Sequence, residues 1–201
     1  SDLREFENNF AAHIGTKYAV SFNSATSALY AAVVATGIKP GQEVIVPPYT
    51  FTSTATSVLM HNAIPVFADV QDDIFCIDPK SIERNITSLT KAIIPVHLFG
   101  HPAEMDEVMK IAERYDLMVI EDCAQAPGAK YKGQNVGTIG SCGIFSFQES
   151  KNIATGEGGI LVTNDDKIVE IARMVRNHGE AILDTQKQRT YNTEFLGWGY
   201  R

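Results

Sequence analysis

The chain has 201 residues, of which 44% are hydrophobic and 20% are charged, and its formal net charge is −7. This length and composition suit one globular domain, or one large domain with an appendage, with a substantial core. No basic cluster interrupts the acidic composition and no apolar run reaches the roughly 18 residues of a membrane span, so nucleic acids and membranes are not expected partners.

Helical and strand-like segments alternate along the chain. In chain order we expect helix 3–14, strand 18–22, helix 27–36, strand 43–46, helix 52–61, strand 64–70, helix 80–85, strand 92–96, helix 104–115, strands 117–120, 142–147 and 159–163, and a helix through 168–175. Short apolar runs without polar alternation, separated by amphipathic helices, are typical of buried parallel strands. The sequence therefore predicts an α/β fold with a mostly parallel central sheet covered by helices on both faces.

The pattern becomes polar and irregular from about Asn177. We therefore expect residues 1–176 to form one domain and residues 177–201 to form an irregular connection. The sequence starts directly in a helix and stops at Arg201 without a closing element, so we expect a fragment of a longer protein.

The informative residues follow strands, where open α/β sheets bind their ligands. The run Asn23-Ser24-Ala25-Thr26-Ser27 follows the first strand and opens a helix. Free amides at a helix start, among small hydroxyl residues, suit a phosphate group. An ordinary helix cap is the alternative interpretation, and the chain has neither a Walker loop nor a GxGxxG motif.

Two further groups follow later strands. The acids Glu121 and Asp122 come after strand 117–120, where a carboxylate can cap a helix, bind a metal or pair with a pyridine nitrogen. No His or Cys lies at ligand spacing, so a metal is disfavoured and none is predicted. Ser146 lies near the end of the strand 142–147, and Lys151 follows that strand. A desolvated lysine has a lowered pKa and can form a Schiff base. A solvated surface lysine and a polar edge-strand serine are the ordinary alternatives.

A phosphate cradle, a carboxylate for a ring nitrogen and an amine for a Schiff base are what pyridoxal phosphate (PLP) requires of a protein. Each signal is modest alone, but together they reinforce one another. The cysteines Cys76, Cys123 and Cys142 show no metal-type spacing, and the sequence has no signal peptide, which predicts reduced thiols and a cytoplasmic protein. His97 borders this region, where a hydrogen-bonded structural role is expected.

Several runs resemble the DegT/StrS-type sugar aminotransferases, a branch of the fold-type I PLP enzymes. The most specific combination is Glu121-Asp122-Cys123-Ala124-Gln125-Ala126, then Phe145-Ser146-Phe147 with Lys151, then Gly156-Glu157-Gly158-Gly159. Further matching runs are 15–20, 23–29, 40–45, 48–51, 65–70, 95–100, 177–179 and 196–201. The resemblance covers essentially the whole chain and implies the three-layer α/β/α large domain of that fold type.

Roles for individual residues follow from the resemblance by position. It implies that Lys151 joins the cofactor covalently and moves a proton during catalysis, and that Asp122 pairs with the ring nitrogen. It implies that Gln125 lies near the ring hydroxyl and that Phe51 stacks on the ring. Chemistry alone would not have selected Phe51, because an aromatic residue is more often part of a core.

The resemblance also assigns the phosphate and the assembly. The amides of Ala25 and Thr26 and the hydroxyl of Ser146 would hold the phosphate. Family members are homodimers with a shared active site, and Gly199 stands where the family usually has an asparagine that reaches the partner subunit's phosphate. The family's C-terminal small domain and the segment normally preceding Leu3 are missing.

The implied function is a PLP-dependent aminotransferase that moves an amino group from a donor, with glutamate as the expected one, to a keto sugar linked to a nucleotide. Two alternatives come from within the cofactor class. One is a sugar dehydratase, against which Lys151 argues because those relatives carry histidine there; the other is an aminobenzoate-type synthase. A third is an inactive regulatory or sensory protein, against which the joint presence of Asp122, Gln125, Ser146 and Lys151 argues. Sugar, nucleotide and stereochemistry cannot be read from the sequence.

Overall fold

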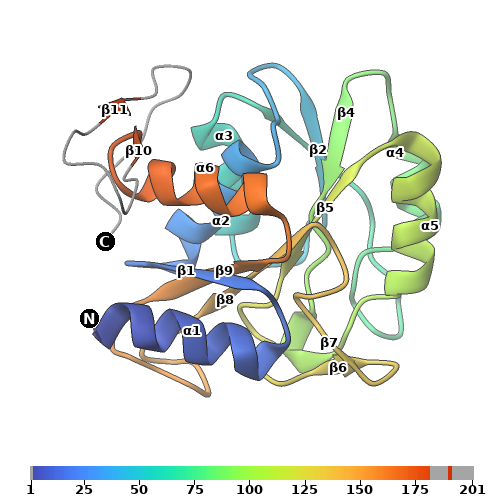
Figure 1. Ribbon diagram of the computed structural model, residues 1–201. Coiled ribbons are helices and arrows are strands. Elements are labelled where there is room, and N and C mark those ends of the chain that lie inside the picture. The colour runs from blue at the N-terminus through green and yellow to red at the C-terminus, as the bar shows by residue number, and fades with distance from the viewer. Residues whose placement is uncertain (1, 182–189, 192–201) are drawn as a thin grey trace.

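The computed structural model describes residues 2–181 and 190–191. A seven-stranded sheet runs through its centre, with strand order β1-β9-β8-β5-β4-β2-β3 (Figure 1). Its strands are β1 Tyr18–Phe22, β2 Glu43–Val46, β3 Ile64–Phe67, β4 Thr90–Ile93, β5 Met118–Asp122, β8 Cys142–Ser146 and β9 Gly159–Thr163. Only β9 runs against its neighbours in this sheet, pairing antiparallel with both β1 and β8. The mostly parallel sheet that the sequence predicts is therefore confirmed.

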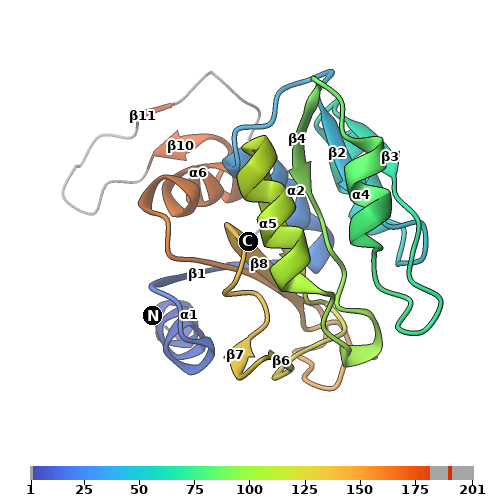
Figure 2. The same cartoon turned by 90° about the vertical axis from the view of Figure 1, so that its right-hand side faces the viewer.

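Helices cover both faces of the sheet. They are α1 Asp2–Ile14, α2 Ala25–Ala35, α3 Ser53–Met60, α4 Pro79–Asn85, α5 Met105–Tyr115 and α6 Asp166–Arg176. Successive strand residues enter different cores: Ile144 packs into the cluster that includes α2 and α6, whereas Phe145 packs into the cluster that includes α1. A third cluster joins the sheet to α4 and α5, the side that faces the viewer in Figure 2. The result is a three-layer α/β/α arrangement.

Helix α2 lies deepest among the helices. Nine of its residues, from Ser27 to Ala35, are buried, because the sheet packs on one side of it and α3 and α6 on the other. A run of Ala and Val fits this position, since small apolar side chains let neighbouring elements approach closely. The start of α2 is thereby fixed at one edge of the sheet.

The parallel direction of the strands brings distant segments to one edge. The chain leaves β1, β2, β5 and β8 at their carboxyl ends, and these ends lie on the same edge of the sheet. Ligands of open α/β sheets bind beyond this edge. The residues that follow these four strands are therefore brought together.

Some boundaries differ from the expected ones. Helix α2 begins at Ala25, two residues before the predicted start, because Ser24 caps it. Strand β4 ends at Ile93 and not at residue 96, since Pro95 has no N–H for the ladder, although its carbonyl accepts from the Asp122 amide. Strand β3 ends at Phe67, opposite the last residue of β2, after which Pro47 and Pro48 interrupt the partner.

The sequence assigned no element to residues 130–135, which form a hairpin of β6 Lys130–Tyr131 and β7 Gln134–Asn135. Its two turn residues, Lys132 and Gly133, both have positive φ, as a tight hairpin requires. The remaining short elements are a 3-10 turn, Leu98–Gly100, and the pair β10 Glu180–Ala181 and β11 Thr190–Tyr191. Within the described ranges, no helix has the length and apolar content that crossing a bilayer requires.

Candidate functional site

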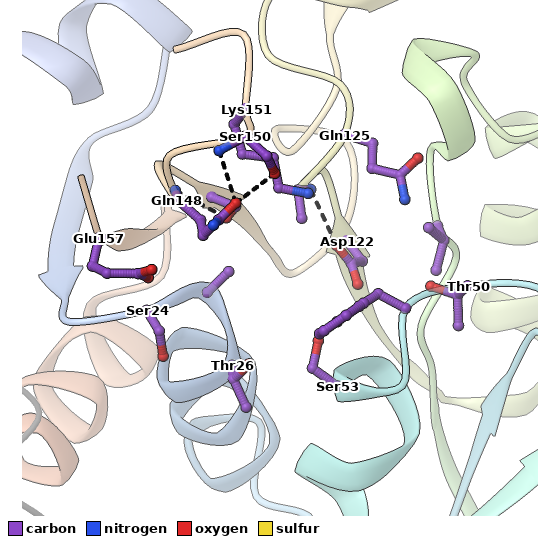
Figure 3. A pocket seen from close by; sticks show the side chains of 16 residues that line it. Ser24, Thr26, Thr50, Ser53, Asp122, Gln125, Gln148, Ser150, Lys151 and Glu157 are labelled. Carbon is purple, nitrogen blue, oxygen red and sulfur yellow. Dashed lines mark hydrogen bonds between the residues drawn. The ribbon is translucent and has the colours of Figure 1, made fainter. Parts of the chain in front are cut away.

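A cavity of about 500 Å³ opens at the carboxyl edge of the sheet. Its walls include every site residue that the sequence predicted: Ala25, Thr26, Phe51, Asp122, Gln125, Ser146 and Lys151. Figure 3 shows that the labelled side chains surround one opening although they come from several elements. A volume of this size suits a small-molecule ligand.

The start of α2 forms one wall of the cavity. Ser24 accepts the Ser27 amide at 3.1 Å, and its carbonyl accepts the Ala28 amide, so both are committed to capping the helix. The amides of Ala25 and Thr26 belong to the same first turn, where N–H groups lack a partner within the helix. The positive end of the helix dipole therefore points into the cavity, which favours an anion there.

Gly159 allows this helix start to approach the sheet. It pairs with Phe22 on one side and with Ser146 on the other. A Cβ at this position would lie 2.4 Å from the Ala25 nitrogen and from the Ser24 carbonyl group. The missing side chain thus brings the amides of α2 close to Ser146, which is buried in the sheet interior and not on an edge strand.

Asp122 is the last residue of β5 and is 4% exposed. Its Oδ1 accepts the Ala124 amide at 3.1 Å, and its Oδ2 accepts the Thr54 hydroxyl at 2.8 Å. Burial raises the pKa of this carboxyl, although these two hydrogen bonds and the nearby His97 and Lys151 act in the opposite direction. Among the described residues, no cationic side chain forms an ion pair with it. A cationic group of a ligand would fill this role.

Lys151 lies five residues beyond β8 and is half-buried. Its backbone amide donates to the Gln148 carbonyl at 2.9 Å, which fixes the turn that carries it. A second cavity of about 310 Å³ shares Lys151 and Gln125 with the first. The lysine therefore stands between the two cavities. Gln125 accepts the Phe99 amide at 2.9 Å through Oε1, which orients its side chain.

Phe51 is 69% exposed and lines the cavity, so it is not a core residue. It lies between β2 and α3, two residues before the start of α3. Two other exposed aromatic residues, Tyr49 and Phe99, lie nearby, with ring centroids 6.2 Å apart. Exposed aromatic side chains beside a cavity are typical of a surface that meets a ligand or another protein.

His97, Glu121 and Cys123 bring possible metal-binding atoms within 4.8 Å of one another, although their spacing matches no metal motif. The Glu121 carboxylate already accepts the amides of Gly137, Ile139 and Gly140, and it contacts His97 Nε2 at 2.9 Å. Burial raises the pKa of the Cys123 thiol, which opposes the thiolate form that metals bind. This cluster fits a structural hydrogen-bond network, as expected for His97.

The cavity also contains residues that the sequence did not single out as ligands. They are Ser24, Thr50, Ser53, Val96, Ala124, Gln148, Ser150, Glu157 and Gly158. Ser24 belongs to the run expected at the phosphate, and Glu157 and Gly158 belong to a matching motif, but none of them was assigned a role. Thr50 and Ser53 carried no signal, because hydroxyl residues near helix starts usually act as caps. The predicted departure at Gly199 lies outside the described residues.

Comparisons with known proteins agree with this geometry. A model of the DegT/DnrJ/EryC1/StrS aminotransferase family matches residues 1–201. The chain is 46% identical over 199 residues to a UDP-N-acetyl-3-dehydro-alpha-D-glucosamine 3-aminotransferase of Acidithiobacillus ferrooxidans, covering 98% of this chain and 52% of that protein. It is 44% identical over 197 residues to a GDP-perosamine synthase of Caulobacter vibrioides, covering 98% and 52%.

A solved structure shows the same fold. The crystal structure of NtdA from Bacillus subtilis with bound cofactor PMP matches with a TM-score of 0.88 and 31% identity, over 98% of this chain and 43% of that chain. The chain spans about half the length of the curated relatives that it matches.

Proposed function

The chain belongs to the DegT/DnrJ/EryC1/StrS aminotransferase family, and we propose that the protein containing it is a PLP-dependent aminotransferase acting on a keto sugar linked to a nucleotide. The observation that carries this proposal is the single cavity that joins a helix start, a buried carboxylate and a lysine. Relatives named for GDP- and UDP-linked sugars support the substrate class. Glutamate is the proposed amino donor.

The residues of the cavity fit PLP on three counts. The helix start and Ser146, brought together by Gly159, suit a phosphate. Asp122 is a buried acid without a described ion-pair partner, and a protonated ring nitrogen would supply one. Lys151 offers an amine at the same cavity. When bound, the cofactor supplies an aldehyde that condenses with amines and a ring that accepts electrons.

Each residue then has a defined task. The amides of Ala25 and Thr26 would hold the phosphate, and the Asp122 carboxylate would accept a hydrogen bond from the protonated ring nitrogen. The amine of Lys151 would hold the cofactor and would serve as the general acid and base that moves a proton. The resemblance adds Phe51 against the ring face and Gln125 beside the ring hydroxyl.

We include the assembly and the location in the proposal. A homodimer with a shared active site is supported by the exposed aromatic residues Phe51, Tyr49 and Phe99 near the cavity, and the mass of the full-length protein in solution tests it. A cytoplasmic location is supported by three free, buried cysteine thiols. The division at residues 176 and 177 coincides with the end of α6 and stays a prediction.

A panel of keto-sugar nucleotides, assayed with the full-length protein, PLP and glutamate, tests the function. We expect an aminated sugar and 2-oxoglutarate in equal amounts with at least one member of the panel. Glutamate alone should remove the visible absorbance of the PLP-loaded protein. Unchanged absorbance after addition of glutamate would instead support an inactive binding protein.

Gly159→Ala tests the phosphate site. The added Cβ meets the backbone of Ser24 and Ala25, so the start of α2 has to move, at a cost of about 1–3 kcal/mol in the free energy of unfolding. We expect the affinity for PLP to fall by about tenfold or more, since the phosphate loses aligned amides. Affinity for pyridoxal, which has no phosphate, should change far less. Equal losses for the two compounds would argue against this location of the phosphate.

A further inference from the structure

Thr54 contacts the proposed catalytic machinery without lining the cavity. It lies in the first turn of α3, is fully buried, and donates its hydroxyl to Asp122 Oδ2 at 2.8 Å. The two residues are 68 positions apart in the sequence. Burial of a polar side chain without a hydrogen-bond partner is costly, so this contact accounts for a hydroxyl at a position where Val would otherwise fit.

The direction of the hydrogen bonds follows from the chemistry of the groups. An ionised carboxylate can only accept hydrogen bonds, so Thr54 donates its single hydroxyl proton to Asp122. The contact of 2.9 Å between the hydroxyls of Thr50 and Thr54 must then have Thr50 as its donor. Thr50 lies in the bend that precedes α3, and Thr54 lies in the first turn of that helix. The two hydroxyls therefore form a short chain of hydrogen bonds that ends on the carboxylate.

Asp122 is held on both of its oxygens. Oδ1 accepts the Ala124 amide, and Oδ2 accepts Thr54. One protein donor on each oxygen restricts rotation of the carboxylate plane. A carboxylate has about four acceptor positions, so capacity remains for a ligand in the cavity that Asp122 lines.

We propose that Thr54 is a positioning residue, whose hydroxyl keeps the Asp122 carboxylate ionised and oriented for the ring nitrogen of the cofactor. This inference rests on the proposed function. Without the hydroxyl, Asp122 keeps one protein donor, and a neutral carboxyl offers the ring nitrogen a weaker partner. Thr54 therefore contributes to cofactor affinity through the ring nitrogen alone and not through the phosphate or the aldehyde.

The test uses two cofactors and two substitutions. Thr54→Val removes the hydroxyl and keeps the shape, whereas Thr54→Ser keeps the hydroxyl. Cofactor-free full-length protein is titrated with PLP and with its carbocyclic analogue, in which a C–H group replaces the ring nitrogen. We expect Thr54→Val to weaken PLP binding by about 10–100-fold and analogue binding by about twofold or less. Thr54→Ser should bind both compounds like the unmodified protein.

A second substitution covers the case in which Thr54→Val does not fold. Thr50→Val removes the hydroxyl that donates to Thr54. It should therefore also weaken PLP binding and not analogue binding, but only by about two- to fivefold. Equal losses for PLP and the analogue, or no loss for either, would overturn the role of Thr54. The proposed function fails separately, if the unmodified protein binds neither compound. Equal binding of both compounds by the unmodified protein would instead overturn the contact of Asp122 with the ring nitrogen, and with it the role of Thr54.

Discussion

Lys151→Ala is expected to remove the Schiff-base absorbance band of the PLP-loaded protein and to lower the amination rate by about 10²–10⁴-fold. The physical reason is the loss of the one amine that lines both cavities. No other lysine lines either of these two cavities in the described part of the chain. The remaining residues would still bind the cofactor through its phosphate and ring nitrogen, so the loss should fall on the rate more than on affinity.

The measurement is single-turnover amination together with absorbance spectra before and after borohydride. Lys110→Ala is the matched control, because Lys110 is an exposed lysine whose amine pairs with Glu107 at 2.6 Å. A surface ion pair of this kind contributes little to stability, and its loss should leave rate and spectrum unchanged. Full amination activity in Lys151→Ala would contradict the assignment, whereas partial rescue by an added small amine would support it.

The sequence predicted the sheet better than its connections. The run Val44-Ile45-Val46 is short, β-branched and closed by Pro47, which favours a buried strand, so β2 was expected with the bounds that the structure has. The antiparallel direction of β9 was not predictable, since direction depends on where the 147–158 connection returns. The hairpin at residues 130–135 was missed because its strands have two residues each, too few for a periodic signal.

The sequence likewise predicted some residues of the candidate site and missed others. Residues with distinctive chemistry after strands, such as Asp122 and Lys151, were proposed from their position and from the family resemblance, and both line one cavity. Thr54 was missed, because a threonine in an expected helix has many ordinary explanations and its partner lies 68 residues away. Gly159 was noted only as part of a matching motif. Its role depends on a distance of 2.4 Å to another segment, which no local pattern contains.

Asp122→Asn should separate cofactor binding from stability. Asn has nearly the same shape and can still accept the Ala124 amide, while its NH₂ group can donate to the Thr54 hydroxyl, whose proton then turns away. The negative charge that pairs with a ring nitrogen is lost. We therefore expect the amination rate to fall by about 10²–10³-fold and PLP affinity to fall with it.

The same substitution should not lower the stability of the cofactor-free protein above the pKa of Asp122. Burial raises the pKa of Asp122 in the folded state above its unfolded value, so the folded protein binds this proton more tightly. The stabilising contribution of the protonated carboxyl is fully present below the unfolded pKa and is lost as the pH rises through the folded one. Above that pH, Asp122→Asn should be at least as stable as the unmodified protein, and the difference should shrink in acid.

Denaturant unfolding of both cofactor-free proteins across this pH range measures the effect, with the exposed Asp73→Asn as the control for a general change in charge. A destabilised Asp122→Asn at neutral pH would mean that the hydrogen bonds of Ala124 and Thr54 outweigh the cost of burying the charge. Higher stability together with lost cofactor affinity would instead mean that Asp122 serves cofactor binding and lowers the stability of the cofactor-free protein. Only a bound cation would then offset the cost of burying its negative charge.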